Sequence, residues 1–131
     1  MTERAAAFLR LAHEELGAAE RLVDAFPRQA AYQLHQAAEK IARAVLARSG
    51  IPFGTSHNLG QMAAALPLDH PWRPRLMAFD HLSPAATVYR YPSPTGRLKP
   101  PPEEAALRTD VQRLRTLLAE AEGLSRPPPS R

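Results

Sequence analysis

The sequence predicts an all-α fold, a bundle of three long helices and two short ones. Three long segments carry apolar residues at three- and four-residue spacing, the period of a helix with one buried face. No convincing pair of strand-like segments and no internal repeat is present. With 131 residues and 44% hydrophobic content, the chain has the size of one domain that buries a core. Short connections between the helices favour antiparallel neighbours.

The first predicted helix begins after Thr2, whose hydroxyl can cap its first turn, and it is limited by Pro27. Apolar residues recur along one face at helical spacing: Phe8, Leu9, Ala12, Leu16, Ala19 and Val23. This regular stripe predicts an amphipathic helix against the core.

The second predicted helix begins near Pro27 and runs to Ser49, where Gly50 and Pro52 form a strong stop. Apolar residues on two of its faces predict that it is the central helix. Its middle also carries polar residues spread around the axis: Gln33, His35, Gln36 and Glu39. At least one of these must face other protein, where a polar group needs a hydrogen-bond partner.

Two short helices are predicted next. One starts at Ser56 or Asn58 and is closed by Pro67. The other follows Pro71 and directs three apolar residues toward the core: Leu76, Phe79 and Leu82. Residues 83–101 contain five prolines, too many for a helix, and therefore predict a long loop. Loops of this length in a compact domain are usually functional or disordered.

The last long helix is predicted from Pro102 to Gly123, with Glu103 and Glu104 at its positive N-terminal end. Its apolar stripe consists of Leu107, Val111, Leu114, Leu118 and Ala121. We assign residues 1–123 to the helical bundle and residues 124–131, with three consecutive prolines, to a disordered tail.

Composition excludes several classes of function. The absence of cysteine removes disulfides, thiolate metal sites and cysteine nucleophiles, and it suits a reducing compartment such as the cytoplasm. The chain has no apolar run long enough for a membrane span, and its N-terminus lacks the apolar core of a signal peptide. We therefore expect a soluble cytoplasmic protein without membrane association.

The net charge of +4 is concentrated in one segment. Acidic and basic residues balance in residues 1–72 and again in residues 100–131. Between them, a single acid, Asp80, faces five cations interleaved with Tyr89 and Tyr91: Arg73, Arg75, Arg90, Arg97 and Lys99. A basic segment with aromatic residues is a candidate surface for anions or nucleic acid. The alternative is a solvated loop with scattered arginines.

Three fragments, taken in order, resemble the HEPN domain proteins of prokaryotes. They are residues 32–40 (YQLHQAAEK), 56–59 (SHNL) and 89–92 (YRYP), between a first amphipathic helix and a closing helix. The resemblance covers roughly residues 4–120. Three fragments at compatible spacing are a stronger signal than any one alone.

The resemblance implies an up-and-down bundle that forms a homodimer, with residues 89–92 near the cleft of the dimer. Some HEPN proteins are metal-independent toxin ribonucleases that use an Arg and a His with four to six residues between them. Others are non-catalytic partners of a minimal nucleotidyltransferase in two-component, toxin–antitoxin-like systems, or modules proposed to bind nucleotides.

Two pairs satisfy the Arg/His spacing, Arg75 with His81 and Arg28 with His35. Arginine would hold the phosphate and histidine would move a proton near neutral pH. With this many arginines, about two such matches arise by chance, so the spacing alone is uninformative. Arg75 and His81 are the better candidates, although Arg75 is followed by Leu76 rather than the polar residue usual in the family.

Other polar residues are better explained by structure than by chemistry. His35 and Glu39 lie one turn apart, but no second pair of ligands at helical spacing accompanies them, so we predict no metal site and no cofactor. We expect His35 and Glu39 to belong to a structural polar cluster with Gln36, Lys40 and His57.

The sequence leaves three functions in competition. The leading one is a HEPN binding module that contacts nucleotide, RNA or a nucleotidyltransferase partner through Tyr89, Arg90, Tyr91, Arg97 and Lys99. The second is a ribonuclease that uses Arg75 and His81. The third is a structural role, in which the polar centre of the second helix forms a dimer interface and nothing is bound.

Overall fold

The computed structural model describes residues 2–124, and all regular secondary structure in these residues is helical. Three long helices form its body: α1 (Glu3–Leu22), α2 (Pro27–Arg48) and α5 (Glu104–Leu124). Three short ones complete it: α3 (Leu59–Ala64), α4 (Trp72–Met77) and the 3₁₀-helix η1 (Asp80–Ala86). The predicted all-α bundle is confirmed, with one short helix more than expected.

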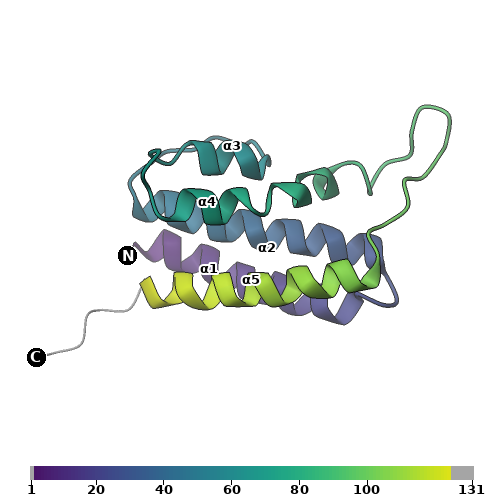
Figure 1. Cartoon of the computed structure of the whole chain (residues 1–131), viewed down its shortest axis with the longest axis horizontal. Coiled ribbons are helices and arrows are strands. Elements are labelled where there is room, and N and C mark those ends of the chain that lie inside the picture. Colours follow the sequence, from purple (N-terminus) through teal and green to yellow (C-terminus); the bar gives the residue numbers. More distant parts are fainter. Residues whose placement is uncertain (1, 125–131) are drawn as a thin grey trace, which may run out of the picture.

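Apart from the short α3, successive passes of the chain along the bundle run in opposite directions (Figure 1). The chain passes along α1, returns along α2, goes back through α4 and η1, and returns again along α5. α1 and α5 lie on one side of α2, and the short helices lie on the other. α2 is therefore the central helix, as its two apolar faces predict, and the bundle has an up-and-down course.

The ends of α1 and α2 follow the local signals in the sequence. The Thr2 hydroxyl oxygen accepts a hydrogen bond from the Ala5 amide at 3.1 Å, which caps α1. Pro27 occupies the first turn of α2, where its missing N–H has no consequence. After α2, Gly50 adopts a positive φ of 70°, and the Ile51 amide donates to the Leu46 carbonyl.

The long loop begins later than predicted. Residues 83–86 belong to η1, so their assignment to the loop was wrong, and the irregular connection spans residues 87–103. A short 3₁₀-helix tolerates Pro84 because proline prefers a helical φ. Two apolar side chains of η1 are buried: Leu82 and Ala85. Their burial against the core favours helical backbone at this position.

η1 also supports the start of α3. The Asn58 side chain caps α3 by accepting from the Gln61 amide at 2.8 Å. Asp80 of η1 accepts from the Gly60 amide at 2.9 Å. A Cβ at Gly60 would lie 2.8 Å from the Asp80 carboxylate, so a larger residue here would displace that carboxylate.

The core lies between α2 and its neighbours. Large apolar side chains from all three long helices are fully buried, including Leu16, Leu34, Ile41 and Leu114. α2 contributes many buried alanines, which allow the helices on both sides to approach closely. In residues 2–124, no helix has the length and apolar character needed to cross a membrane. α5 extends one residue beyond the predicted boundary at 123, and the rest of the predicted tail, residues 125–131, lies outside the described residues.

Lys40 is not part of the polar cluster predicted for it, because it faces α1. Its ammonium group pairs with Glu15 Oε1 at 2.9 Å in a half-buried position. The other carboxylate oxygen of Glu15 is buried and has no hydrogen-bond partner. Burial therefore raises the pKa of Glu15 above 4.5, although the bond to Lys40 lowers it in part.

This pair makes the stability of the fold depend on pH. Because burial favours protonated Glu15, the folded state binds more protons than the unfolded chain at pH values just above 4.5. The contribution of Glu15 to the free energy of unfolding is therefore fully present below pH 4.5, and it is lost as the pH rises through the raised pKa of Glu15. Urea unfolding measures the free energy of unfolding of wild type and of Glu15→Gln. The value for wild type minus the value for the variant should fall as the pH rises. The exposed neighbour Glu14, changed to Gln, is the control, and a rising difference for Glu15→Gln contradicts the assignment.

Candidate functional site

The connection between η1 and α5, residues 87–103, is here named the Tyr/Arg loop. It extends from the bundle at the end where α2 begins (Figure 1). Its first part is turned, since the Arg90 and Tyr91 amides both donate to the Thr87 carbonyl. Its tip is closed by a hydrogen bond from the Ser93 amide to the Arg97 carbonyl at 2.8 Å. Backbone hydrogen bonds thus give this proline-rich segment a defined shape.

Arg90 is held by aromatic side chains. Its guanidinium carbon lies 4.3 Å from the ring centroid of Tyr32 on α2 and 5.6 Å from that of Tyr91. Both distances are within the range of cation–π attraction. Arg90 itself is exposed, and so is Tyr91, at 62%. The guanidinium of Arg90 therefore lies beside two tyrosine rings on an exposed residue.

A second contact joins the last part of the loop, near Lys99, to α2. Arg28 lies one turn before Tyr32 on α2, and its Nη2 donates to the Lys99 carbonyl at 3.1 Å. The Lys99 ammonium lies 5.9 Å from the ring centroid of Tyr89, which packs against the core. We name the set joined by these contacts the Tyr/Arg cluster: Arg28, Tyr32, Tyr89, Arg90, Tyr91 and Lys99.

The ion pairs of residues 2–124 leave out the cations of the Tyr/Arg loop. Within residues 2–124, no carboxylate forms an ion pair with Arg90, Arg97 or Lys99. Arg97 is exposed at the loop tip, outside the Tyr/Arg cluster. Uncompensated guanidinium and ammonium groups beside tyrosine rings can bind phosphate and stack on bases.

The two arginines earlier in the basic segment are used within the fold. Arg73 donates to the Leu66 carbonyl at 2.8 Å. Arg75 pairs with Glu120 of α5, and its guanidinium lies 4.6 Å from the ring centroid of Trp72. The basic segment of residues 73–99 is therefore not one continuous surface, and its free cations belong to the Tyr/Arg loop.

His81 lies in a different ion pair from Arg75. Its Nε2 is 3.0 Å from both oxygens of the buried Asp110 on α5, and its Nδ1 is 3.1 Å from the Ala78 carbonyl. Both ring nitrogens thus face oxygen acceptors within the fold. Arg113 lies beside this pair, 3.8 Å from Asp110 and 4.8 Å from the ring centroid of Phe79.

A pocket of about 290 Å³ opens beside these two ion pairs. Arg75, Phe79 and Arg113 line it, together with residues of α5. The structure thus brings Arg75 to the same pocket as Arg113, whereas His81 does not line the pocket and stacks on the Phe79 ring with centroids 6.3 Å apart. The two residues of the predicted Arg/His pair therefore contact different carboxylates, Arg75 that of Glu120 and His81 that of Asp110.

The polar centre of α2 forms a buried network with the segment before α3. His35 is fully buried, and its Nε2 donates to the His57 carbonyl at 2.8 Å while Gln36 Oε1 lies 3.3 Å from its Nδ1. His57 Nδ1 lies 2.5 Å from Oε1 of the buried Glu39. Arg43 completes the network, 3.4 Å from the other oxygen of Glu39. Each polar group of α2 named here thus has a partner, as burial requires.

Comparison with known proteins decides the family. The model of the HEPN domain family matches residues 5–124. The chain belongs to the HEPN domain family. No curated protein and no solved structure shows significant similarity to this HEPN chain.

The family assignment fits the geometry of this HEPN domain. The match includes all six helices except the first two residues of α1, so the bundle, the Tyr/Arg loop and the polar centre of α2 all belong to the family's domain. Both a binding module and a ribonuclease are compatible with the family. The residues of this chain must therefore distinguish the two.

Several residues of this HEPN domain that contribute to these sites were not assigned to them from sequence, including Arg28, Tyr32, Arg43, Asp110 and Arg113. Arg28 and Tyr32 have the i, i+4 spacing of one helix face, a signal that would have grouped them. Asp110 interrupts the apolar stripe of α5 and is buried, which is a signal for a polar partner. In the described part of the chain, no group of three metal-binding side chains is placed to hold a metal ion.

Proposed function

We propose that this HEPN domain is a binding module whose Tyr/Arg loop contacts single-stranded RNA or a nucleotide. One observation carries the proposal: Arg90, Arg97 and Lys99 have no carboxylate partner within residues 2–124, and two of them lie against tyrosine rings. Other cations of the chain, such as Arg75 and Arg115, are neutralised by glutamates.

The arrangement suits a phosphate with an adjacent base. The guanidinium of Arg90 offers a planar N–H edge that fits two phosphate oxygens. The exposed ring of Tyr91 offers a face on which a base can stack. Because the Tyr32 contact already orders Arg90, binding loses little side-chain entropy.

The test is a binding titration with a fluorescein-labelled single-stranded RNA. Arg90→Ala removes one phosphate contact and one stacked cation, and we expect affinity about tenfold weaker, as for a charge-assisted hydrogen bond of about 1.4 kcal/mol. The matched control is Arg48→Ala, an exposed arginine of α2 outside the cluster, which should change affinity less than about twofold. Equal affinities of wild type and Arg90→Ala would refute the role of the loop.

The proposal includes a homodimer and a protein partner, a minimal nucleotidyltransferase in a two-component, toxin–antitoxin-like system. Its support is the family resemblance together with the exposed Tyr/Arg loop. Light scattering after gel filtration should give twice the mass of the chain. A small nucleotidyltransferase encoded beside this gene should co-purify with the wild-type chain and less with Arg90→Ala, and a monomer that binds no such protein contradicts this part.

The second candidate function is a metal-independent ribonuclease. The observation that favours it is the bond of His81 to both oxygens of Asp110, beside Arg113, because a carboxylate can orient a catalytic imidazole. Against it, both ring nitrogens of His81 face acceptors.

RNA cleavage without metal, measured for wild type and His81→Ala, separates the two functions. We expect no cleavage by either protein. Cleavage by wild type that falls about hundredfold or more in His81→Ala would establish the ribonuclease instead.

A further inference from the structure

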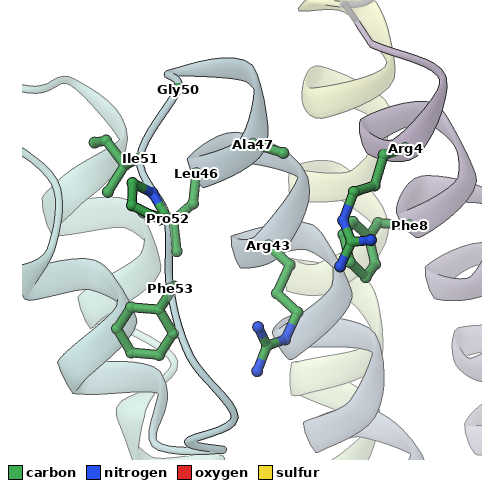
Figure 2. Close-up of a pocket in the computed structure, with 9 residues that line it drawn as sticks. All are labelled: Arg4, Phe8, Arg43, Leu46, Ala47, Gly50, Ile51, Pro52 and Phe53. Atoms are coloured by element: carbon green, nitrogen blue, oxygen red, sulfur yellow. The ribbon is translucent and has the colours of Figure 1, made fainter.

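A separate pocket lies at the other end of α2 from the Tyr/Arg cluster. It has a volume of about 360 Å³ and is formed by the start of α1, the end of α2 and residues 50–53 (Figure 2). This volume is within the range of sites for small organic ligands. The Tyr/Arg loop does not contribute to the pocket.

The walls of the pocket carry two aromatic side chains. Figure 2 shows Phe53 on one side and Phe8 on the other, with Arg43 between them. Both rings are half-buried, and the side chain of Leu46 adds buried apolar surface. A flat apolar group placed here would contact rings that are otherwise left partly in water.

The two arginines of the pocket differ in how they are neutralised. Arg43 faces Glu39 and donates to the carbonyls of Gly54 and Ser56, both at 3.0 Å. Arg4 is exposed, lies 5.1 Å from the ring centroid of Phe8, and has no carboxylate partner within residues 2–124. The pocket therefore combines apolar walls with two arginines, the paired Arg43 between the rings and Arg4, which has no carboxylate partner within residues 2–124.

We propose that this pocket binds a small aromatic carboxylate. The ring of the ligand packs against Phe8 and Phe53 beside the side chain of Arg43, which lies between them, and its carboxylate accepts hydrogen bonds from the guanidinium of Arg4. Arg43 contributes the second positive group, held in place by its bonds to Glu39 and to the chain that leads to α3. A charge-assisted bidentate contact at the edge of an apolar pocket favours an anion over a neutral molecule of the same shape.

The probe is 2-naphthoate, with 2-naphthamide as its neutral counterpart. Calorimetric titration of the full chain should show naphthoate binding at least about tenfold more tightly than naphthamide. Arg4→Gln should remove this preference by weakening naphthoate about tenfold while naphthamide is unchanged. Phe53→Leu should weaken both ligands, because it removes a wall of the pocket.

Two controls make the result specific. Arg10→Gln removes an equal charge from an exposed position of α1 outside the pocket and should leave naphthoate affinity within about twofold. Arg90→Ala should also leave it unchanged, which separates this pocket from the Tyr/Arg loop. The proposal is overturned if naphthoate and naphthamide bind equally, if neither binds, or if Arg4→Gln and Arg10→Gln have the same effect.

Discussion

Single-stranded RNA should bind about a hundredfold more weakly, at about 0.1 M salt, when Arg90, Arg97 and Lys99 are all replaced by alanine. Each cation that contacts a phosphate releases a counterion and contributes about 0.7 to the slope of log affinity against log salt for single strands. Three such contacts contribute a slope of about 2, which is about two decades of affinity between 1 M and 0.1 M salt. The slope should therefore fall by about 2 in this variant.

Fluorescence anisotropy at a series of salt concentrations measures both quantities. The matched control is the triple variant Arg10→Ala, Arg21→Ala, Arg48→Ala, which loses the same charge from exposed positions of α1 and α2. If RNA binds the Tyr/Arg loop, the control keeps most of its affinity and slope. Equal losses in the two triple variants would mean that RNA responds only to net charge, and the loop assignment would be wrong.

Glu39→Ala should destabilise the fold by about 3 kcal/mol. Glu39 is buried, and its carboxylate accepts from His57 at 2.5 Å and faces Arg43 at 3.4 Å. Without it, Arg43 loses its acidic partner in a half-buried position, and the segment before α3 loses its bond to α2. The corresponding fall in the melting temperature is roughly 10 °C for a domain of this size.

Urea unfolding and thermal denaturation of Glu39→Ala test this expectation. Glu14→Ala is the matched control, because Glu14 is exposed on α1, and it should change stability by less than about 0.5 kcal/mol. A double-mutant cycle with His57→Ala isolates the coupling between the two side chains. A loss for Glu39→Ala no larger than that for Glu14→Ala would show that the network is not important for stability.

The long helices could be predicted from sequence because their signals are local. Thr2, Pro27 and Gly50 mark three of the helix ends, and each acts through the backbone within a few residues of itself. The apolar stripes of α1 and α5 repeat over five turns, so single exceptions do not obscure them. These features are sufficient for the fold class and the order of the long helices.

η1 could not be predicted in the same way. Pro84 and the prolines after it indicate a loop when the sequence is considered alone. In the structure, Leu82 and Ala85 are buried, and Asp80 accepts from the Gly60 amide. These partners are distant in sequence, so the tertiary contacts that favour the 3₁₀-helix have no local signal.

The candidate site was predicted in part. Tyr89, Arg90 and Lys99 stood out because charge and aromatic residues concentrate in one proline-rich segment. Their contact with Arg28 and Tyr32 depends on how the loop folds back onto the start of α2. The bond from Arg28 to the Lys99 carbonyl, for example, joins residues 71 positions apart in the sequence. The Arg75 and His81 spacing contained no information on their partners, Glu120 and Asp110, which come from α5.

By itself, the sequence determined the helical class, the ends of the long helices, the resemblance to HEPN domains and the segment that carries the excess charge. Only the tertiary structure decided which cations are neutralised, since Arg75 is paired with Glu120 whereas Arg90 is stacked on Tyr32. The physical reason is that periodicity and capping act over a few residues, whereas ion pairing and burial depend on helices that meet only after the chain has folded.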